Sequence, residues 1–336
     1  MSNIKRRFQI KLKKVTGNIA GNIFNTAPRI KKSIAKIKRR KLELYPQIIQ
    51  VETTTACNAD CVMCPHSRIK RKKGHMDFEL YKIIVDDCAE NKKFIKTFYP
   101  FLNGELFLTP KWEDYLIYAK KRLPDTDIGV FTNGSLLEME NIDKLIEIEP
   151  DWINISFDGT SKETYERIRR KLSFNQVQNN IFQIVNKRNS LQKVKPRITI
   201  SIIEMEQTSY DVKSFIKKWD SVVDKVTIEP YINWGGAVED KSINRHMICK
   251  RMPCSRLWYN FTILNTGDVV ICCLDYDGEI IIGDVRKQSI REIWTDEKIT
   301  NLRNLHLEGK YSEIRLCEDC NYGKYQTEAP IWWSQR

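Results

Sequence analysis

The chain has 336 residues, of which 41% are hydrophobic and 29% charged, and its formal net charge is +13. The apolar content excludes a chain that is disordered throughout, and 14 Gly and 11 Pro residues are too few for collagen-like or low-complexity proteins. No stretch approaches the ~18 consecutive apolar residues of a membrane-spanning helix, so the sequence predicts no transmembrane segment.

The positive charge is concentrated at the N-terminus. Residues 1–41 hold 14 of the 56 Lys and Arg residues and no Asp or Glu, which leaves a nearly neutral body. Apolar residues recur here at helical spacing and indicate an amphipathic basic arm over residues 1–46. Three roles fit the arm: a solvated helix packed on the body, a segment that binds anionic lipid or an anionic partner, and a nucleic-acid-binding segment. Nucleic acid is the least favoured, because Phe8 and Phe24 are the only aromatic residues within the charged stretch 1–41 that are available for stacking.

From Gln47 onward, strand-like and helix-like segments alternate. The predicted strands are Ile48–Thr53, Ile95–Leu102, Ile128–Thr132, Trp152–Phe157, Arg197–Ile203 and Val226–Tyr231. Amphipathic stretches between them, such as Phe78–Glu90 and Trp112–Arg122, predict helices. The alternation predicts an α/β fold, a partial (β/α)6 barrel with a parallel sheet over residues 47–238. Polar or glycine-containing segments follow the strands, and we expect them to converge at the carboxyl ends, where βα barrels hold their active sites.

After residue 238 the pattern changes. Trp258–Leu264 and Asp268–Leu274 alternate around Asn265-Thr266-Gly267, which predicts a β-hairpin. A predicted helix over Ser289–Leu307 and a cysteine-containing tail follow. We therefore expect a second, smaller module of a β-hairpin plus a helix over residues 239–336.

The chain has ten cysteines and no signal-peptide pattern, which favours metal binding over disulfides. Cys57, Cys61 and Cys64 follow the first predicted strand on one short loop. Three thiolates can hold a 4Fe–4S cluster and leave its fourth iron open. A second set comprises Cys254, Cys272, Cys317 and Cys320. Four thiolates can ligate a cluster completely or form a structural zinc site.

The loop from Cys57 to Cys64 resembles the cluster motif of the radical S-adenosylmethionine (SAM) superfamily, Cys-x3-Cys-x2-Cys after the first strand. Asn103-Gly104-Glu105 resembles that family's Gly-Gly-Glu turn, which binds the SAM amino group, with Asn in place of the first Gly. Thr132-Asn133-Gly134 and Ser156-Phe157-Asp158-Gly159 resemble its third and fourth strand endings. The resemblance covers about residues 47–231. It implies SAM-binding roles for Met63, Asn103, Gly104, Glu105, Thr132, Asn133, Ser156 and Asp158.

The second cysteine set resembles the SPASM extension of radical SAM enzymes, in its shortened twitch form. No cysteine follows Cys320, so the resemblance implies one auxiliary 4Fe–4S cluster that passes electrons. The spacing Gly267-x4-Cys272 selects Cys272 over the adjacent Cys273, and Cys249 is a less favoured substitute for Cys254. The spacings are similar to those of twitch-containing aminocyclitol dehydrogenases.

Together these resemblances imply a radical SAM oxidoreductase with SAM and two 4Fe–4S clusters as cofactors. A 5′-deoxyadenosyl radical would abstract hydrogen from a sugar or aminocyclitol carbon, and the auxiliary cluster would accept the second electron. The reaction also needs a base that accepts the proton of the substrate hydroxyl. The sequence offers four candidates near strand ends and does not choose among them: Arg169, Glu204, Glu229 and Tyr231. Three alternatives stay open: a radical epimerase with Cys249 or Cys273 as hydrogen donor, a peptide-modifying SPASM enzyme, and a non-catalytic iron–sulfur or zinc protein.

The same resemblance implies the partners. A flavodoxin or ferredoxin would supply the low-potential electron, and the substrate would be a small molecule. Oxygen-labile clusters imply a cytoplasmic protein, which the basic arm would bring to an anionic membrane surface.

Overall fold

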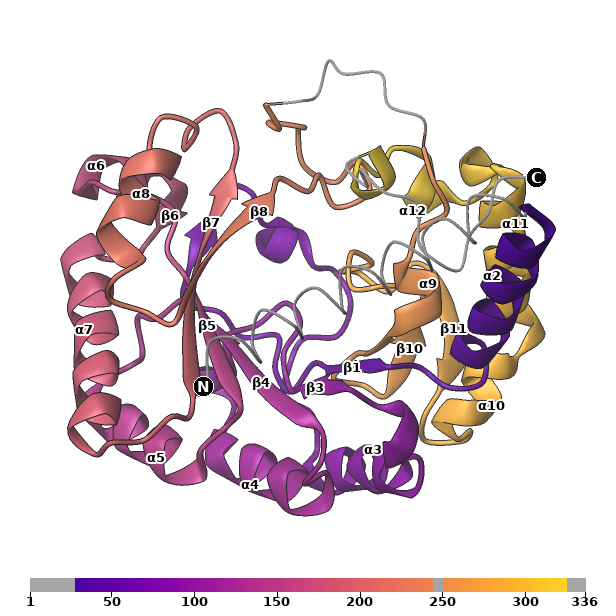
Figure 1. Ribbon diagram of the computed structural model, residues 1–336, viewed down its shortest axis with the longest axis horizontal. Helices are drawn as coiled ribbons and strands as arrows, with labels where there is room; N and C mark the ends of the chain where they lie inside the picture. The colour runs from indigo at the N-terminus through magenta and orange to yellow at the C-terminus, as the bar shows by residue number, and fades with distance from the viewer. Residues whose placement is uncertain (1–27, 244–250, 325–336) are drawn as a thin grey trace, which may run out of the picture. The chain divides into compact units, whose positions relative to one another are not determined.

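The computed structural model describes residues 28–243 and 251–324 (Figure 1). Most of the predicted arm, including Phe8 and Phe24, lies outside the described residues, as does Cys249. Within the arm, α2 (Pro28–Leu42) is helical, and the role of the arm stays a prediction. None of the helices in the described ranges combines the length and the apolar character needed to cross a membrane.

Leu44–Gln326 form one compact unit. In its described residues a nine-stranded sheet runs in the order β11-β10-β9-β1-β3-β4-β5-β7-β8. Neighbours from β1 to β8 pair in parallel, which confirms the predicted α/β partial barrel. These strands are β1 (Ile48–Val51), β3 (Thr97–Tyr99), β4 (Asp127–Thr132), β5 (Trp152–Ser156), β7 (Arg197–Glu204) and β8 (Lys225–Pro230).

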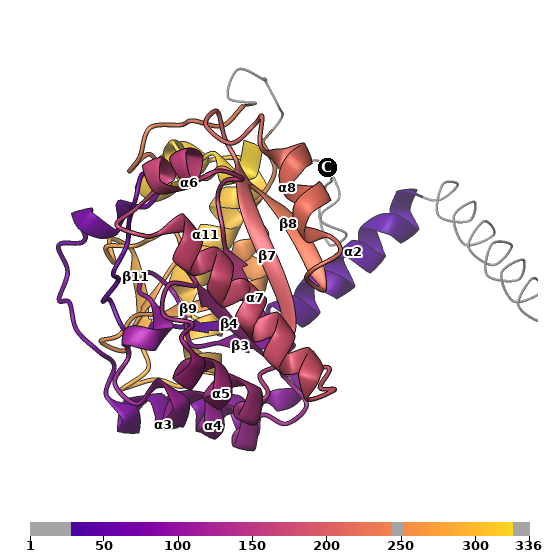
Figure 2. The same ribbon diagram turned by 90° about the vertical axis from the view of Figure 1, so that its left-hand side faces the viewer.

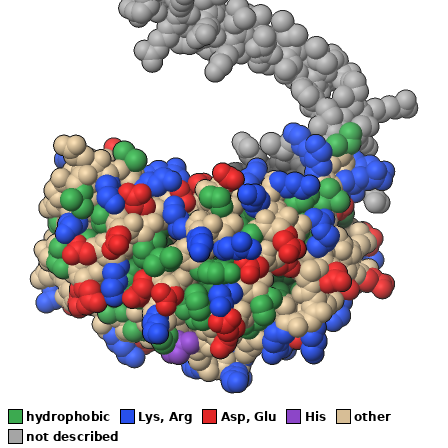
Figure 3. All heavy atoms as spheres, turned by 90° about the horizontal axis from the view of Figure 1, so that it is seen from below, with side chains coloured by type: hydrophobic (Ala, Val, Ile, Leu, Met, Phe, Trp, Pro, Cys, Tyr) green, Lys and Arg blue, Asp and Glu red, His purple; other side chains and the backbone are tan. Residues whose placement is uncertain are grey.

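Helices cover the outer side of this parallel sheet, as Figures 1 and 2 show. They are α3 (Phe78–Glu90), α4 (Trp112–Arg122), α5 (Met139–Ile148), α6 (Lys162–Ile168), α7 (Phe174–Ser190) and α8 (Val212–Trp219). Asp77 starts α3, because its carboxylate accepts hydrogen bonds from the first free backbone N–H groups of the helix. The buried face of α3 includes Cys88, which is therefore a core residue and no ligand of either cysteine set. On the face over α3, α4 and α5, acidic and basic side chains are interspersed (Figure 3).

The C-terminal region extends the same sheet. The predicted hairpin is present as β9 (Asn260–Ile263) and β10 (Asp268–Val270), and β11 (Ile281–Asp284) adds a further antiparallel strand. β9 pairs in parallel with β1, so the hairpin lies against the first strand of the barrel. This pairing could not be read from the sequence, because nothing local specifies a partner some 210 residues away.

Three sequence-based boundaries in this region were wrong. The strand predicted over Asp268–Leu274 ends at Val270, so Cys272 and Cys273 lie in the bend that follows it. The predicted strand from Trp258 begins as a short helix, α9 (Arg256–Tyr259). The single helix predicted over Ser289–Leu307 is two helices, α10 (Ile290–Thr295) and α11 (Glu297–Glu308). Asp296 separates them, because its backbone is extended (φ −63°, ψ 156°) and its side chain accepts a hydrogen bond from the N–H of Lys298 to cap α11.

Several short elements complete the unit. They are β2 (Asp60–Cys61), β6 (Arg169–Arg170), α12 (Arg315–Glu318), and the 3₁₀ turns η1 (Pro65–Arg68), η2 (Lys92–Phe94), η3 (Leu106–Leu108), η4 (Tyr311–Glu313) and η5 (Tyr322–Lys324). β2 and β6 form an antiparallel pair that brings the first cysteine loop beside the segment after α6.

Candidate active site

The first cysteine loop leaves the carboxyl end of β1 and is held by the end of β4. Asn58, inside the loop, donates a hydrogen bond to Ser135 Oγ (2.8 Å) and accepts one from Asn133 Nδ2 (2.9 Å). A backbone bond from Cys64 N to Cys61 O closes the turn before η1. Asn58 was not singled out from the sequence. It keeps the loop at the strand ends, where the predicted polar segments converge.

The three thiols of this loop are close enough to influence one another. Burial raises the pKa of Cys57 to about 11 and of Cys64 to about 12, and proximity to Cys61 adds to both shifts. In the described residues, no three His, Cys, Asp or Glu side chains lie close enough to hold a single metal ion. A 4Fe–4S cluster spreads its thiolates over different irons, so this all-sulfur donor set on one loop fits a cluster better than a single ion.

Arg169 joins the loop to the end of β5. Its Nε lies 2.7 Å from Asp158 Oδ2, and its Nη1 lies 3.7 Å from Cys61 Sγ. Asp158 is fully buried, and its other oxygen accepts the N–H of Ile203 (2.6 Å). Burial alone would lower the pKa of Arg169, but the charges of Asp158 and Cys61 outweigh it and raise that pKa. Arg169 therefore stays protonated and acts as a fixed positive charge beside the loop.

Glu105 is a buried carboxylate with no cation bonded to it. Its oxygens accept hydrogen bonds from Thr132 Oγ1 (2.7 Å) and from the N–H of Asn133 (2.8 Å). Burial raises its pKa to about 7, although these hydrogen bonds oppose the shift. A positively charged or hydrogen-bonding amino group beside it would relieve this cost, so Glu105 suits the amino group of SAM.

Gly104 is required by a close approach of two backbones. A Cβ at this position would lie 2.2 Å from the carbonyl oxygen of Thr54, just before the cysteine loop. The same approach lets the N–H of Glu105 donate to the carbonyl of Ala56 (2.7 Å). The backbone of Gly104 and Glu105 is therefore packed directly against the start of the first cysteine loop.

Asn103, which replaces a glycine of the family motif, has a structural partner. Its Nδ2 donates to Glu52 Oε1 (3.2 Å), and the same oxygen pairs with Arg71 (2.6 Å). Arg71 also donates to Asn265 in the β9–β10 turn (2.9 Å). This buried network connects the cysteine loop, the predicted SAM turn and the C-terminal hairpin.

A cavity of about 400 Å³ lies on the inner face of the sheet. Six of the residues singled out from the sequence line it: Met63, Ser156, Arg169, Glu229, Tyr231 and Cys273. Glu204 is not among its lining residues, although it ends β7. Burial raises the pKa of Tyr231 to about 12, and its hydroxyl donates to the carbonyl of Glu239 (2.7 Å).

Asn154 is a lining residue that the sequence reasoning missed. Its Oδ1 is buried and has no hydrogen-bond partner, which is costly unless a ligand satisfies it. The signal was present in the alternation of β5, because Asn154 and Ser156 are two residues apart and share the cavity face.

The cysteines of the second predicted set lie close enough near the hairpin to influence one another. Burial raises the pKa of Cys254 to about 11 and of Cys317 to about 12, and the neighbouring thiols contribute. Burial raises the pKa of the Cys272 thiol, and the charges of Cys273, Cys317 and Cys254 all add to the shift, so Cys272 lies close to the other cysteines of this set. His306 lies beside it: the Cys254 N–H donates to Nδ1 (3.2 Å), and Nε2 lies 3.4 Å from Cys317 Sγ. The donor at Nδ1 leaves the ring proton on Nε2, which therefore points at sulfur.

Cys273 is close to Cys254 and Cys272 and also borders the cavity. It lines the cavity together with Arg256 and Tyr322, while its neighbour Cys272 joins the second set. Arg256 donates to Cys273 Sγ, and its guanidinium stacks over the Tyr322 ring at 4.1 Å. The cavity thus borders barrel strands on one side and, on the other, residues that neighbour the second cysteine set in the sequence, such as Cys273 and Arg256.

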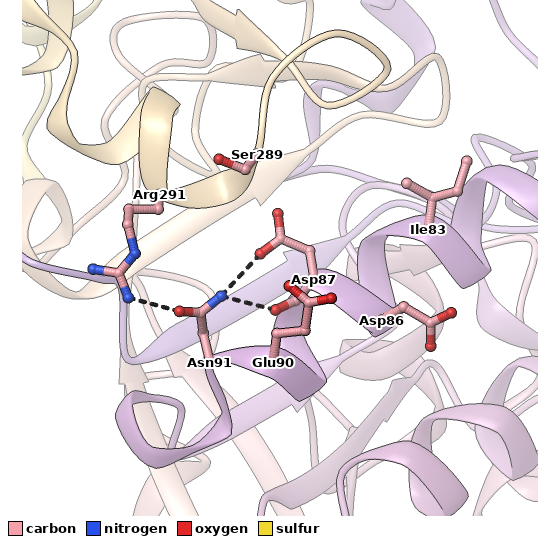
Figure 4. Close-up of a pocket in the computed structure, with 7 residues that line it drawn as sticks. All are labelled: Ile83, Asp86, Asp87, Glu90, Asn91, Ser289 and Arg291. Atoms are coloured by element: carbon pink, nitrogen blue, oxygen red, sulfur yellow. Dashed lines mark hydrogen bonds between the residues drawn. The ribbon is translucent and has the colours of Figure 1, made fainter.

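A second hollow, of about 600 Å³, lies outside the barrel between α3 and the start of α10 (Figure 4). It is lined by acidic residues, but its polar groups pair with one another. Asn91 donates to Asp87 Oδ1 and accepts from Arg291 (2.6 Å), and Asp87 also accepts the N–H of Ile290 (2.7 Å). These hydrogen bonds connect α3 of the barrel with α10 of the C-terminal region, so the hollow is part of a structural contact.

Family comparisons agree with both cysteine sets. The model of the radical SAM superfamily matches residues 51–191, and the iron–sulfur cluster-binding SPASM domain matches residues 254–321. The chain belongs to the radical SAM superfamily and carries a SPASM domain. The two domains imply SAM and iron–sulfur clusters as cofactors.

Two curated relatives cover most of this radical SAM enzyme. It is 23% identical to the S-adenosyl-L-methionine-dependent 2-deoxy-scyllo-inosamine dehydrogenase of Niallia circulans, over 84% of this chain and 95% of the relative. It is 22% identical to the tungsten-containing aldehyde ferredoxin oxidoreductase cofactor-modifying protein of Pyrococcus furiosus, over 85% of this chain and 92% of that protein.

Solved structures share the fold. The structure of BtrN in complex with AdoMet and 2-DOIA has a TM-score of 0.58 at 19% identity, covering 85% of this chain and 97% of BtrN. SuiB of Streptococcus suis, bound to its precursor peptide SuiA, has a TM-score of 0.65 at 12% identity, covering 86% of this chain and 74% of SuiB. At these identities the likeness concerns the fold alone.

Proposed function

We propose that this radical SAM enzyme oxidises a carbon of a small sugar or aminocyclitol by two electrons. The observation that supports the proposal most is the cavity, which is lined by the barrel strands and by the surroundings of the second cysteine set. A substrate there would lie between two cysteine sets. Polar residues such as Asn154 and Ser201 stand among the apolar side chains of the cavity wall and would bind the hydroxyl groups of a small molecule.

The cysteine sets would hold two 4Fe–4S clusters. With SAM bound at the first cluster, reductive cleavage supplies a 5′-deoxyadenosyl radical for hydrogen abstraction. Glu105 would bind the SAM amino group, and the fixed charge of Arg169 is suited to its carboxylate. Met63 and Ser156, which line the cavity, would contact the adenine and the ribose. The second cluster would accept the remaining electron of the substrate.

Alcohol oxidation also needs a proton acceptor, and the structure narrows the four candidates. Arg169 is tied to Asp158 and keeps its proton, and Glu204 is not a lining residue. Tyr231 donates its hydroxyl to a backbone carbonyl, and its pKa is raised. We therefore assign the role to Glu229, a carboxylate that lines the cavity at the end of β8.

The curated relative from Niallia circulans supports this class of reaction, because its name describes a SAM-dependent dehydrogenase of an aminocyclitol. Radical epimerisation is the second candidate. It is favoured by one observation, that the thiol of Cys273 lines the cavity and could return a hydrogen atom to a substrate radical.

The test uses the reconstituted holoenzyme with SAM and dithionite under anaerobic conditions. We expect 5′-deoxyadenosine, and we expect it to vanish in the variant with Ala at Cys57, Cys61 and Cys64. About eight irons per chain are expected for two clusters. With a candidate aminocyclitol, a ketone product that is lost in Glu229→Gln supports dehydrogenation, whereas an inverted alcohol that is lost in Cys273→Ser supports epimerisation. No 5′-deoxyadenosine from the intact protein would refute the proposal.

A further inference from the structure

The segment that follows the first cysteine loop is strongly basic and exposed. Arg68, Lys70, Lys72 and Lys73 all point outward, while Ile69 between them is buried. We call these four residues the basic patch. Outside residues 1–41 the chain has one more acidic than basic residue, so the patch is a local concentration of charge and not a reflection of the average.

In the described residues Arg68 donates to the carbonyl of Ala237, and the three lysines of the patch have no carboxylate bonded to their side chains. The side chains of Lys70, Lys72 and Lys73 make no hydrogen bond or ion pair within the described ranges. Arg71, in the same run, is different, because it is partly buried and pairs with Glu52. Asp277, the carboxylate at this segment, is bonded by backbone N–H groups, those of Lys70 (2.6 Å) and Arg71 (2.9 Å).

The patch is fixed beside the first cysteine loop at both of its ends. It starts directly after Cys64, through the turn η1. It ends at Gly74, whose N–H and carbonyl both bond to Thr55, two residues before Cys57. His66 adds a third tie, because its Nε2 lies 2.6 Å from the Thr55 carbonyl oxygen. The patch therefore lies over the stem of the loop that would hold the SAM-binding cluster.

We propose that the basic patch is the docking surface for a small acidic protein that carries one electron at low potential, of the flavodoxin type. The proposal rests on the proposed function, in which one electron must reach the first cluster for every SAM cleaved. The carrier is oxidised by one electron, and that electron breaks one C–S bond of SAM to give methionine and the 5′-deoxyadenosyl radical. An acidic carrier at this surface would stand next to the loop where the electron is needed.

Electrostatic complementarity of this kind acts mainly on association. Opposite charges at a docking surface raise association rates by about 10- to 1,000-fold at low ionic strength, and added salt removes the gain. Electron delivery by the carrier should therefore depend on the patch and on salt, whereas reduction by a small chemical reductant should depend on neither.

The test variant is K70E/K72E/K73E, in which each replaced side chain is free of contacts that hold the fold. The matched control is K121E/K213E/K217E, which changes the net charge equally at exposed lysines of α4 and α8. Each protein is reconstituted with iron and sulfide. SAM cleavage is measured with dithionite and with a reduced flavodoxin, and the affinity for oxidised flavodoxin is measured by calorimetry at low and high salt.

We expect the patch variant to cleave SAM normally with dithionite and to lose at least about tenfold in flavodoxin-driven rate and in flavodoxin affinity at low salt. The control variant should behave as the unmodified protein. Equal affinities of all three proteins for flavodoxin, or equal losses in patch and control variants, would overturn the docking surface. The docking surface would also be overturned if the patch variant lost binding to anionic vesicles but kept its affinity for flavodoxin. The patch would then be a lipid-binding site. If the unmodified protein does not cleave SAM with dithionite, the proposed function is refuted. The flavodoxin affinities measured by calorimetry still test the docking surface in that case.

Discussion

Cys61 and Arg169 are joined twice, by their backbones and by their side chains. They are paired residues in the short antiparallel ladder of β2 and β6, and Arg169 Nη1 lies 3.7 Å from Cys61 Sγ. The ladder sets the position of the middle cysteine of the first loop relative to the end of β5, where Arg169 binds Asp158. A thiolate ligand and a fixed cation are thus placed together by main-chain geometry.

Replacing Arg169 by Gln should destabilise the protein, because it leaves the buried Asp158 carboxylate without its cation. Breaking one side of a buried ion pair costs about 3–5 kcal/mol. Urea unfolding of the intact and variant chains measures this loss. The double variant Arg169→Gln/Asp158→Asn serves as control and should recover much of the stability, since it removes the unpaired charge. Equal stability of Arg169→Gln and the unmodified chain would contradict a structural role for the pair.

Glu105 should make the stability of the metal-free chain depend on pH. Its pKa is raised from 4.5 to about 7 in the folded protein, so the folded state binds this proton more tightly than the unfolded state. The resulting stabilisation, up to about 3 kcal/mol, is complete below pH 4.5 and is lost as the pH rises through 7. Unfolding free energies at pH 5 and pH 8, compared between the unmodified chain and Glu105→Gln, isolate the contribution. A difference that does not change with pH would exclude it.

The adjacent cysteines of the hairpin should behave differently on reconstitution. Cys272→Ala should reduce the iron content from about eight to about four per chain, because it removes a ligand of the second cluster. Cys273→Ser should keep about eight irons, because Cys273 faces the cavity. Iron and sulfide analysis of both variants tests which cysteine is the ligand. If Cys273→Ser loses iron and Cys272→Ala keeps it, the ligand is Cys273.

His306 should raise the reduction potential of the second cluster. Burial lowers its pKa to about 3, so the ring is neutral at physiological pH, and its Nε2–H points at Cys317 Sγ. Hydrogen bonds to cluster sulfur stabilise the reduced, more negative state. His306→Leu should therefore shift the midpoint potential of this cluster to lower values in a redox titration, with the iron content unchanged. An unshifted potential with a full iron content would show that the hydrogen bond does not tune the cluster.

The sequence was informative where periodicity is strong or where short spacings encode the chemistry. Phe78–Glu90 and Trp112–Arg122 were predicted to the residue from their amphipathic pattern, and the Asp77 carboxylate additionally caps the start of the first of these helices. The local spacing of Cys57, Cys61 and Cys64 likewise placed them on one loop at a strand end.

Long-range placement was not accessible in the same way. The pairing of Cys61 with Arg169 depends on a ladder of only two residues per strand, too short to leave a periodic pattern. The inward direction of Cys273 depends on how the hairpin joins β1. Glu204, Glu229 and Tyr231 were equivalent candidates by sequence, since only the packed structure shows which of them reach the cavity.

The pairing of β1 with β9 has a consequence for the order in which the protein is made. β1 is synthesised early, but its neighbour on one side, Asn260–Ile263, emerges only after more than two hundred further residues. Until then the strand that supports the first cysteine loop has an open edge, and closing so long a loop carries an entropic cost. The scaffold of the first loop is therefore completed by the segment that also supplies the second cysteine set. The first cysteine loop therefore gains its complete scaffold only after Cys254, the first member of the second set, has been synthesised.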